Sequence, residues 1–171
     1  MKHRTPWSAA LLCWLLCLAL LTACGGSPAE TETAGSCTVS ISCATILDNL
    51  DQLNAAKADF VPDDGVILPE MELSFTEGET AFDLLQRVCR DNGISMESSW
   101  SPLYKTAYIE GIANLYEFDC GKLSGWMYSV NGEFPNYGCS GYTLQDGDVI
   151  CWVYTCDLGE DVGGGYAAGG E

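Results

Sequence analysis

The sequence predicts a small α+β domain, with helix segregated on one face of a mixed β-sheet. Three observations support this class. Residues 149–156 (VICWVYTC) are rich in β-branched and aromatic side chains, as in a strand near the centre of a sheet. Residues 37–43 (CTVSISC) alternate apolar and polar side chains with the period of a strand. Between them, residues 81–91 carry an apolar stripe with helical spacing.

The segment after the first strand is expected to form a short helix. Apolar residues recur with a helical period over residues 46–53, and the helix should end before Pro62. Residues 63–65 (DDG) then predict a turn. Residues 66–75 are predicted to be strand, interrupted at Pro69 because proline cannot donate a ladder hydrogen bond.

The main helix is predicted to begin after Thr76 and to run to about Asp91. Thr76 and Glu79 have the spacing of a capping box, and Asn92-Gly93 offers the left-handed residue that ends a helix. Its predicted buried stripe comprises Ala81, Leu84, Leu85 and Val88, with Phe82 and Cys89 beside it.

Residues 94–123 predict irregular chain and short strands, whose tyrosines either line a binding groove or pack in the core. A strand follows at residues 125–130, where Trp126, Tyr128 and Val130 alternate with Met127 and Ser129. Residues 131–132 (NG) predict a tight turn, and an aromatic loop leads to the final strand through residues 146–148 (DGD).

Residues 1–23 are predicted to be a lipoprotein signal peptide. A basic start precedes an apolar stretch that is short for a membrane span. Residues 21–24 (LTAC) resemble a bacterial lipobox, in which Cys24 is lipidated and becomes the mature N-terminus; the alternative is an ordinary secretory signal. The sequence thus predicts an extracytoplasmic lipoprotein held on the membrane surface of a bacterial cell.

Beyond the signal peptide, composition divides the chain into three parts. Residues 24–36 are small and polar and predict a flexible tether. Residues 37–158 form the predicted domain, long enough for a single core. Residues 159–171 are predicted to be a disordered, glycine-rich tail.

Charge and residue types exclude several function classes. The formal net charge is −17, and without Lys2 and Arg4 the mature chain keeps five of its seven basic residues against 24 acidic ones, a net charge of −19. Such a chain repels phosphates, so we expect no nucleic-acid partner. The single histidine, His3, leaves with the signal, which removes histidine-based catalysis and metal ligation. A hydrolase based on Asp146 and Asp148 is the remaining enzyme hypothesis, but such a pair around a turn glycine more often caps a strand, so we expect no enzyme and no catalytic residue.

The cysteines of an exported domain predict disulfide bonds. Cys37 and Cys43 lie about 20 Å apart along one strand, too far to bond to each other. There is no C-x-x-C pair, so we expect no zinc or other metal site. The candidates for disulfide bonds are Cys37, Cys43, Cys89, Cys120, Cys139 and Cys156, with Cys151 as a seventh, odd cysteine.

Three runs of residues carry a family resemblance: 108–112 (YIEGI), 125–132 (GWMYSVNG) and 146–150 (DGDVI). They resemble the family of unknown function related to the C-terminal domain of transcobalamin and intrinsic factor, over roughly residues 37–157. The resemblance implies a β-grasp-like sheet and a corrinoid ligand, which the vertebrate proteins hold between this domain and a larger helical one. It also implies that Cys151 is the unpaired thiol, because related sequences usually hold cysteine at the other six positions.

The function predicted from these patterns is a ligand-binding module, with no bound cofactor and with a corrinoid as the nominated ligand. The alternative is a surface that binds a partner protein or a glycan. In a strand, half of the side chains face the core, so Trp126 is equally well explained as a buried anchor of the sheet. The predicted ligand-binding residues are Trp126, Tyr128, Asn131, Gly132, Tyr137 and Tyr142.

Overall fold

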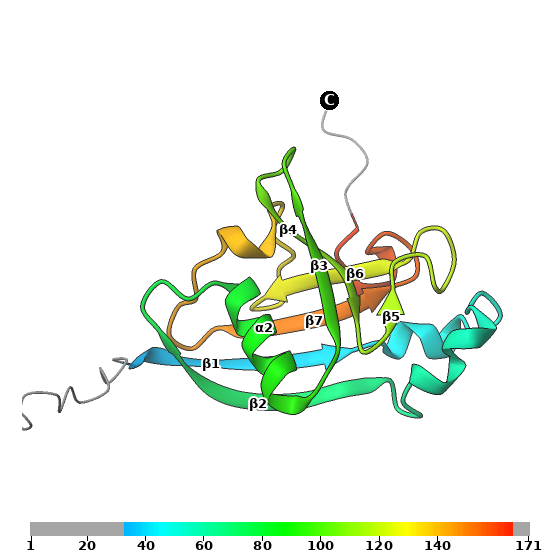
Figure 1. Cartoon of the computed structure of the whole chain (residues 1–171), viewed down its shortest axis with the longest axis horizontal. Coiled ribbons are helices and arrows are strands. Elements are labelled where there is room, and N and C mark those ends of the chain that lie inside the picture. The colour runs from blue at the N-terminus through cyan, green and yellow to red at the C-terminus, as the bar shows by residue number, and fades with distance from the viewer. Residues whose placement is uncertain (1–32, 166–171) are drawn as a thin grey trace, which may run out of the picture. The chain divides into compact units, whose positions relative to one another are not determined.

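The computed structural model describes residues 33–165 (Figure 1). Its elements are β1 Thr33–Ser42, the 3-10 helices η1 Ala44–Asp48 and η2 Ala55–Phe60, β2 Val66–Thr76, α2 Ala81–Asn92, β3 Met96–Ser101, β4 Thr106–Ile112, β5 Leu115–Tyr116, β6 Gly125–Val130, η3 Cys139–Gly141, β7 Val149–Thr155 and η4 Glu160–Val162. The predicted signal peptide and Cys24 lie outside the described residues. None of the helices within residues 33–165 is long and apolar enough to cross a membrane.

The larger sheet has the strand order β2-β1-β7-β6. β1 pairs antiparallel with β2 and parallel with β7, and β6 pairs antiparallel with β7. The first strand and the final strand therefore lie side by side in the middle of a mixed sheet. The predicted central position of the final strand is confirmed. The predicted β-grasp arrangement stays an interpretation.

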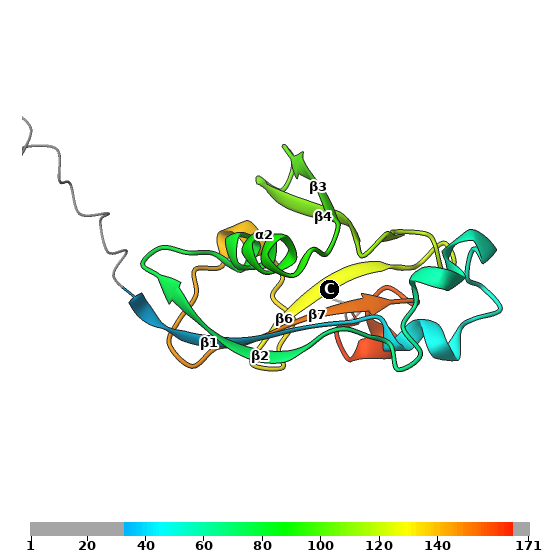
Figure 2. The ribbon, with the colours of Figure 1, turned by 60° about the horizontal axis from the view of Figure 1, so that its bottom comes forward.

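Helix α2 covers one face of this sheet (Figure 2). Its buried residues are Ala81, Leu84, Leu85, Val88 and Cys89, which confirms the predicted stripe. The helix ends at Gly93, whose φ of 66° is left-handed, as the Asn92-Gly93 pair predicted.

The core lies between α2 and the sheet and belongs to the compact unit that begins at Thr33. Alternate residues of β1 and β7 point into it: Cys37, Val39 and Ile41 from β1, and Ile150 and Trp152 from β7. Tyr154 of β7 belongs to a second, smaller cluster that also contains Ile46 and Leu115.

β3, β4 and β5 form a second, antiparallel sheet in that order. The β3–β4 hairpin rises on the side of the larger sheet that carries α2, and it projects beyond the helix (Figure 2). The sequence predicted only short strands here. It did not predict a projecting hairpin.

The capping box of α2 differs from the predicted one. Thr80 is the N-cap: its hydroxyl accepts the Asp83 amide at 3.2 Å, and the Asp83 carboxylate accepts the Thr80 amide at 3.0 Å. Thr76 and Glu79 are joined by two hydrogen bonds, in which the Thr76 amide donates to the Glu79 carboxylate at 3.0 Å and the Glu79 amide donates to the Thr76 carbonyl at 3.1 Å. Neither bond uses the Thr76 hydroxyl, and both belong to the turn before the helix. Both Thr76 with Glu79 and Thr80 with Asp83 have the spacing of a capping box. The second pair forms the cap, because Thr80 directly precedes Ala81, the first buried residue of the helix.

Two further predictions near the start of the domain are corrected. The predicted helix at residues 46–53 is instead the 3-10 helix η1, and η2 follows it. β2 runs continuously through Pro69 because it is an edge strand, where proline is tolerated. A register shift opposite Val39 and Ile41 absorbs the irregularity.

The domain also extends beyond the predicted limits of 37 and 158. β1 begins at Thr33, because the Ser36 amide donates to Asp146 and the strand pairs with β2 as far as Thr76. The described part of the predicted disordered tail is ordered, since the Asp161 carboxylate accepts the Cys156 amide at 2.7 Å and η4 follows β7. Neither segment has an apolar pattern of its own, so composition assigned them to tether and tail.

The cap assignment yields the first prediction. Thr80→Ala should lower the free energy of unfolding by about 1 kcal/mol, because it removes the acceptor for the Asp83 amide. Thr76→Ala is the matched control and should change it by less than about 0.5 kcal/mol, because the hydrogen bonds between Thr76 and Glu79 use the backbone groups of Thr76. Urea denaturation measures both. A larger loss of unfolding free energy for Thr76→Ala than for Thr80→Ala would instead identify Thr76 as the N-cap.

Candidate functional site

Two of the predicted ligand-binding aromatics, Trp126 and Tyr128, belong to β6 and pack toward the core. The Trp126 ring is half-buried, meets Tyr154 edge-on at 5.3 Å between centroids, and donates its indole N–H to the Leu115 carbonyl at 2.8 Å. The Tyr128 ring is buried and stacks on Trp152 at 5.5 Å. Burial raises the pKa of Tyr128 well above its usual range. In this conformation the Tyr128 ring is not open to a ligand at the surface.

Asn131 and Tyr142 converge on one buried carboxylate, that of Asp148. The Asn131 amide N–H donates to it at 3.0 Å and the Tyr142 hydroxyl at 2.8 Å. The Gln145 backbone amide also donates, at 2.8 Å. Burial and the neighbouring Asp148 raise the pKa of Tyr142 to about 12. These two predicted ligand contacts therefore hold the start of β7 in place.

The Asn131-Gly132 turn has the predicted left-handed backbone, with φ of 53° and 83°. Asn131 also accepts the Val149 amide at 2.9 Å, so its side chain is engaged on both sides. Gly132 is exposed and nothing lies within 4 Å of the position of a Cβ atom there. The turn is rigid and open, and its glycine is the part that faces solvent.

Tyr137 is the predicted aromatic whose ring does face solvent, with 51% exposure. Its loop is fixed from below, because the Tyr128 hydroxyl donates to the Tyr137 carbonyl at 2.9 Å. The same loop packs on β4: the Ser140 hydroxyl accepts the Ala107 amide at 2.8 Å and lies 2.7 Å from the Thr106 hydroxyl. Tyr137 therefore sits on a loop attached to the β3–β4 hairpin.

The hairpin carries exposed apolar side chains that sequence reasoning did not select. Trp100 is 60% exposed, Leu103 80% and Tyr104 76%. Trp100 pairs with Ala107, whose backbone amide donates to Ser140 of the Tyr137 loop, so β4 links Trp100 to this loop. We call Trp100, Leu103, Tyr104 and Tyr137 the hairpin surface. Residues 98–109 contain Lys105 and no acidic residue, which is unusual in so acidic a chain.

The signal for this surface was present in the sequence as residues 98–108 (SSWSPLYKTAY). Three aromatics and a leucine surround a proline, at a position where a hairpin turn brings them together. The strands are too weakly patterned to reveal which side chains remain exposed. β3 is exposed over four successive residues, so it shows no alternation between buried and exposed faces.

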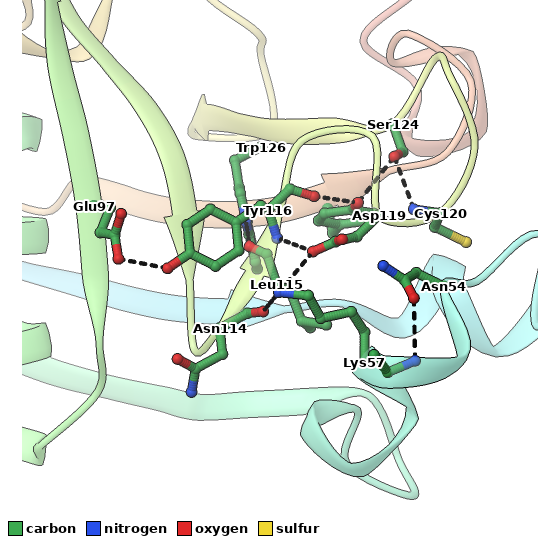
Figure 3. Close-up of polar contacts among 12 residues, drawn as sticks. Asn54, Lys57, Glu97, Asn114, Leu115, Tyr116, Asp119, Cys120, Ser124 and Trp126 are labelled. Atoms are coloured by element: carbon green, nitrogen blue, oxygen red, sulfur yellow. Dashed lines mark hydrogen bonds and ion pairs between the residues drawn. The ribbon is translucent and has the colours of Figure 1, made fainter.

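A polar network fixes the base of the hairpin (Figure 3). The Tyr116 hydroxyl of β5 reaches across β4 and donates to Glu97 of β3 at 2.5 Å. The hydrogen bond to Glu97 raises the pKa of Tyr116. Gly111 permits this crossing, because a Cβ there would lie 2.6 Å from the Tyr116 ring. The three strands are thereby tied together at one level.

Lys57 supports the same ring from η2. Its ammonium lies 4.4 Å from the centroid of the Tyr116 ring, 3.2 Å from the Asp119 carboxylate, and donates to the Asn114 carbonyl at 2.7 Å (Figure 3). These three contacts join η2 to the β4–β5 turn and to the β5–β6 loop, so Lys57 acts as a structural clamp. Residues 33–165 contain no group of three or more Cys, His, Asp or Glu side chains placed to hold a metal ion.

Comparison with known families gives one match. Residues 78–156 match the family described as Domain of unknown function (DUF4430). The match contains α2, both hairpin strands and β7, and it confirms the predicted resemblance to a family of unknown function. No curated protein matches the sequence.

Two solved structures show distant similarity. A candidate metal-binding protein from Ruminococcus gnavus ATCC 29149 is 17% identical, with a TM-score of 0.40, covering 71% of this chain and 96% of that one. Haptocorrin in complex with Cbi is 15% identical, with a TM-score of 0.45, covering 80% of this chain and 29% of that one.

The role of Asp148 yields the second prediction. Asp148→Asn should lower the free energy of unfolding by about 2–3 kcal/mol, because it replaces a buried charged acceptor of several hydrogen bonds. Asp146→Asn, on the exposed turn, should cost less than about 1 kcal/mol, since its carboxylate accepts one amide. Denaturant unfolding measures both variants. Equal effects would show that burial of Asp148 does not control this turn.

Proposed function

We propose that this chain is a lipid-anchored, extracytoplasmic module that binds a ligand on the hairpin surface and performs no turnover. The observation that carries the proposal is the exposure of Trp100, Leu103 and Tyr104 on a hairpin whose base is fixed. Contiguous exposed apolar side chains mark interaction sites on soluble domains. The carboxylates of the enzyme hypothesis are engaged elsewhere, Asp148 with Tyr142 and Asp146 with Ser36.

Rigidity supports binding at this surface. Aromatic rings give contact area at a low cost in side-chain entropy, and a fixed backbone lowers the ordering cost further. The Tyr137 loop is held by Tyr128 and by Ser140, and the hairpin base by Tyr116. A ligand therefore meets side chains on a backbone that needs little rearrangement.

The proposed ligand is a corrinoid. The runs at residues 108–112, 125–132 and 146–150 support this assignment through their family resemblance, and the hairpin surface supplies exposed rings for a flat macrocycle to stack on. The surface is open and covers one side of such a ligand. We therefore expect an affinity in the micromolar range or weaker, about −8 kcal/mol or less favourable.

A partner protein or a glycan is the second candidate for the same surface. The observation that favours it is the exposure of Leu103, an aliphatic side chain at the hairpin turn that offers no ring for stacking. A macromolecular partner would cover both the turn and the Tyr137 loop. The ligand titration below separates the two candidates.

The third prediction tests corrinoid binding. The chain that begins at Gly25 should bind cobalamin in calorimetric and absorbance titrations, and Trp100→Ala should weaken binding about tenfold, because a stacking ring and its burial are lost. Tyr137→Ala should act in the same direction. Leu50→Ala is the control, since Leu50 is similarly exposed but lies next to η1. No heat or spectral change at millimolar corrinoid would reject the corrinoid and favour a macromolecular partner.

The fourth prediction tests the anchor. Cys24 lies outside the described residues, and the proposal rests on residues 21–24 alone. In a bacterial host, Cys24→Ser should abolish incorporation of a labelled fatty acid and release the protein from the membrane fraction or block its processing. A wild-type protein that carries no acyl chain would refute lipidation and leave the ligand proposal unaffected.

A further inference from the structure

The six predicted disulfide cysteines fall into two buried clusters. Cys37, Cys89 and Cys139 lie in the core between α2 and the larger sheet. Cys43, Cys120 and Cys156 lie in a second cluster with Ile46, Leu115 and Tyr154. All carry free thiols in this structure. Because each cluster holds an odd number, three bridges among these six would need at least one bond between clusters.

Within the second cluster, hydrogen bonds bring the chain at Cys120 to the end of β7. The Ser124 hydroxyl accepts the Cys120 amide at 3.1 Å and lies 2.9 Å from the Tyr154 hydroxyl (Figure 3). Cys156 directly follows the last residue of β7 and is buried in the same cluster as Tyr154 and Cys120. The two cysteines are therefore neighbours within one small cluster.

A cavity of about 280 Å³ adjoins the pair. It is lined by Asn49, Gln52, Lys122, Leu123, Cys156 and Asp157. The Cys120 thiol donates to the carbonyl of Asn49, one of these lining residues, at 3.3 Å. Cys156 thus lines a polar cavity, and Cys120 is hydrogen-bonded to a residue of its wall.

The two thiols also perturb each other. Burial, then the hydrogen bond and charge of Cys120, raise the pKa of Cys156 to about 12. Burial raises the pKa of Cys120, which a hydrogen bond with Cys156 partly offsets. At neutral pH both groups are mainly protonated thiols, and each reacts through the small fraction that has lost its proton.

We infer that Cys120 and Cys156 form a disulfide bond, which ties the β5–β6 loop to the end of β7. The bond forms by exchange with a disulfide-bearing oxidant, either a small disulfide or an oxidoreductase. One cysteine thiolate attacks the oxidant and releases one thiol; the second cysteine then displaces the other half of the oxidant as a second thiol. Two protein thiols lose two electrons and two protons, and one disulfide of the oxidant is reduced.

The bridge has a structural consequence that follows from its position. The loop it fixes carries Asp119, the partner of Lys57, and leads through Ser124 into β6. Because the polar cavity reaches Cys156, a small reductant can approach the bond from that side, whereas Cys120 is fully buried. We therefore expect slow but measurable reduction of this bond in the folded protein.

Peptide mapping tests the inference directly. The chain from Gly25 on is incubated with oxidised glutathione, alkylated without reduction, and digested with trypsin and chymotrypsin. Cleavage after Lys105 and Lys122 gives peptide 106–122, in which Cys120 is the single cysteine. Cleavage at Trp152 and Tyr154 separates Cys156 from Cys139 and Cys151. The expected product is Cys120 joined to the peptide that contains Cys156.

Two outcomes would overturn the inference: Cys120 joined to another cysteine such as Cys43, or Cys120 and Cys156 both alkylated after oxidation.

Stability against denaturant gives a second measurement. Reduction should lower the denaturation midpoint of the wild type by more than that of the Cys120→Ser, Cys156→Ser double variant. Cys151→Ser is the matched control, since Cys151 is half-buried outside both clusters, and its shift should equal that of the wild type. An equal shift in the double variant would refute the bond.

Discussion

The parallel pairing of β1 with β7 is the constraint on which the rest of the structure depends. Parallel strands cannot be joined by a hairpin, so everything between Ser42 and Val149 is one long connection that must return to the same sheet. The junction where the two strands meet is fixed at Asp148. Its carbonyl accepts the Thr38 amide at 2.7 Å, and its buried carboxylate holds Tyr142 and Asn131. One residue thus couples the start of β7 to β1, to the β6 turn and to the loop before it.

The central position of β7 explains why the most recognisable aromatics are structural. Its alternate residues Trp152 and Tyr154 fill the helix-facing side and are almost completely buried. Each of these two rings packs against an aromatic ring of β6: Trp152 stacks on Tyr128, and Tyr154 meets Trp126 edge-on. The aromatic residues of β6, which carry the family motif at residues 125–132, therefore support the core. The exposed rings come from the β3–β4 hairpin and the Tyr137 loop, whose sequence patterns are weaker.

The predictable parts of the fold are the elements with one face buried against the core, because this burial gives their apolar residues a regular spacing in the sequence. β1, β7 and the apolar face of α2 each have one side against the core, and their alternation or helical stripe shows it in the sequence. The start of α2 was misassigned because Thr76 and Thr80 offer equivalent capping chemistry, and the choice depends on where burial begins. Residues 33–36 were misassigned because β1 extends there along β2 through backbone pairing, without an apolar pattern of its own.

The candidate site was predictable only in part, for the same reason. Tyr137 was selected from the sequence and its ring is exposed, whereas Trp100, Leu103 and Tyr104 were not selected. Exposure of a hairpin turn depends on long-range contacts at its base, such as Tyr116 with Glu97, which join residues far apart in the chain. Sequence patterns report burial of a segment against a core. They do not report how far a segment with no buried face projects from it.

A projecting two-stranded ribbon has little stability by itself, so its base must be held by other elements. Here β5 adds a short third strand, Gly111 leaves room for the Tyr116 ring, and Lys57 supports that ring from the opposite side. The polar groups of the hairpin region are thus concentrated at its base, where Glu97, Asn114 and Asp119 all have protein partners. The turn carries apolar side chains and no acidic group. A rigid base combined with an exposed apolar turn makes the hairpin suited to contact another molecule rather than to close the core.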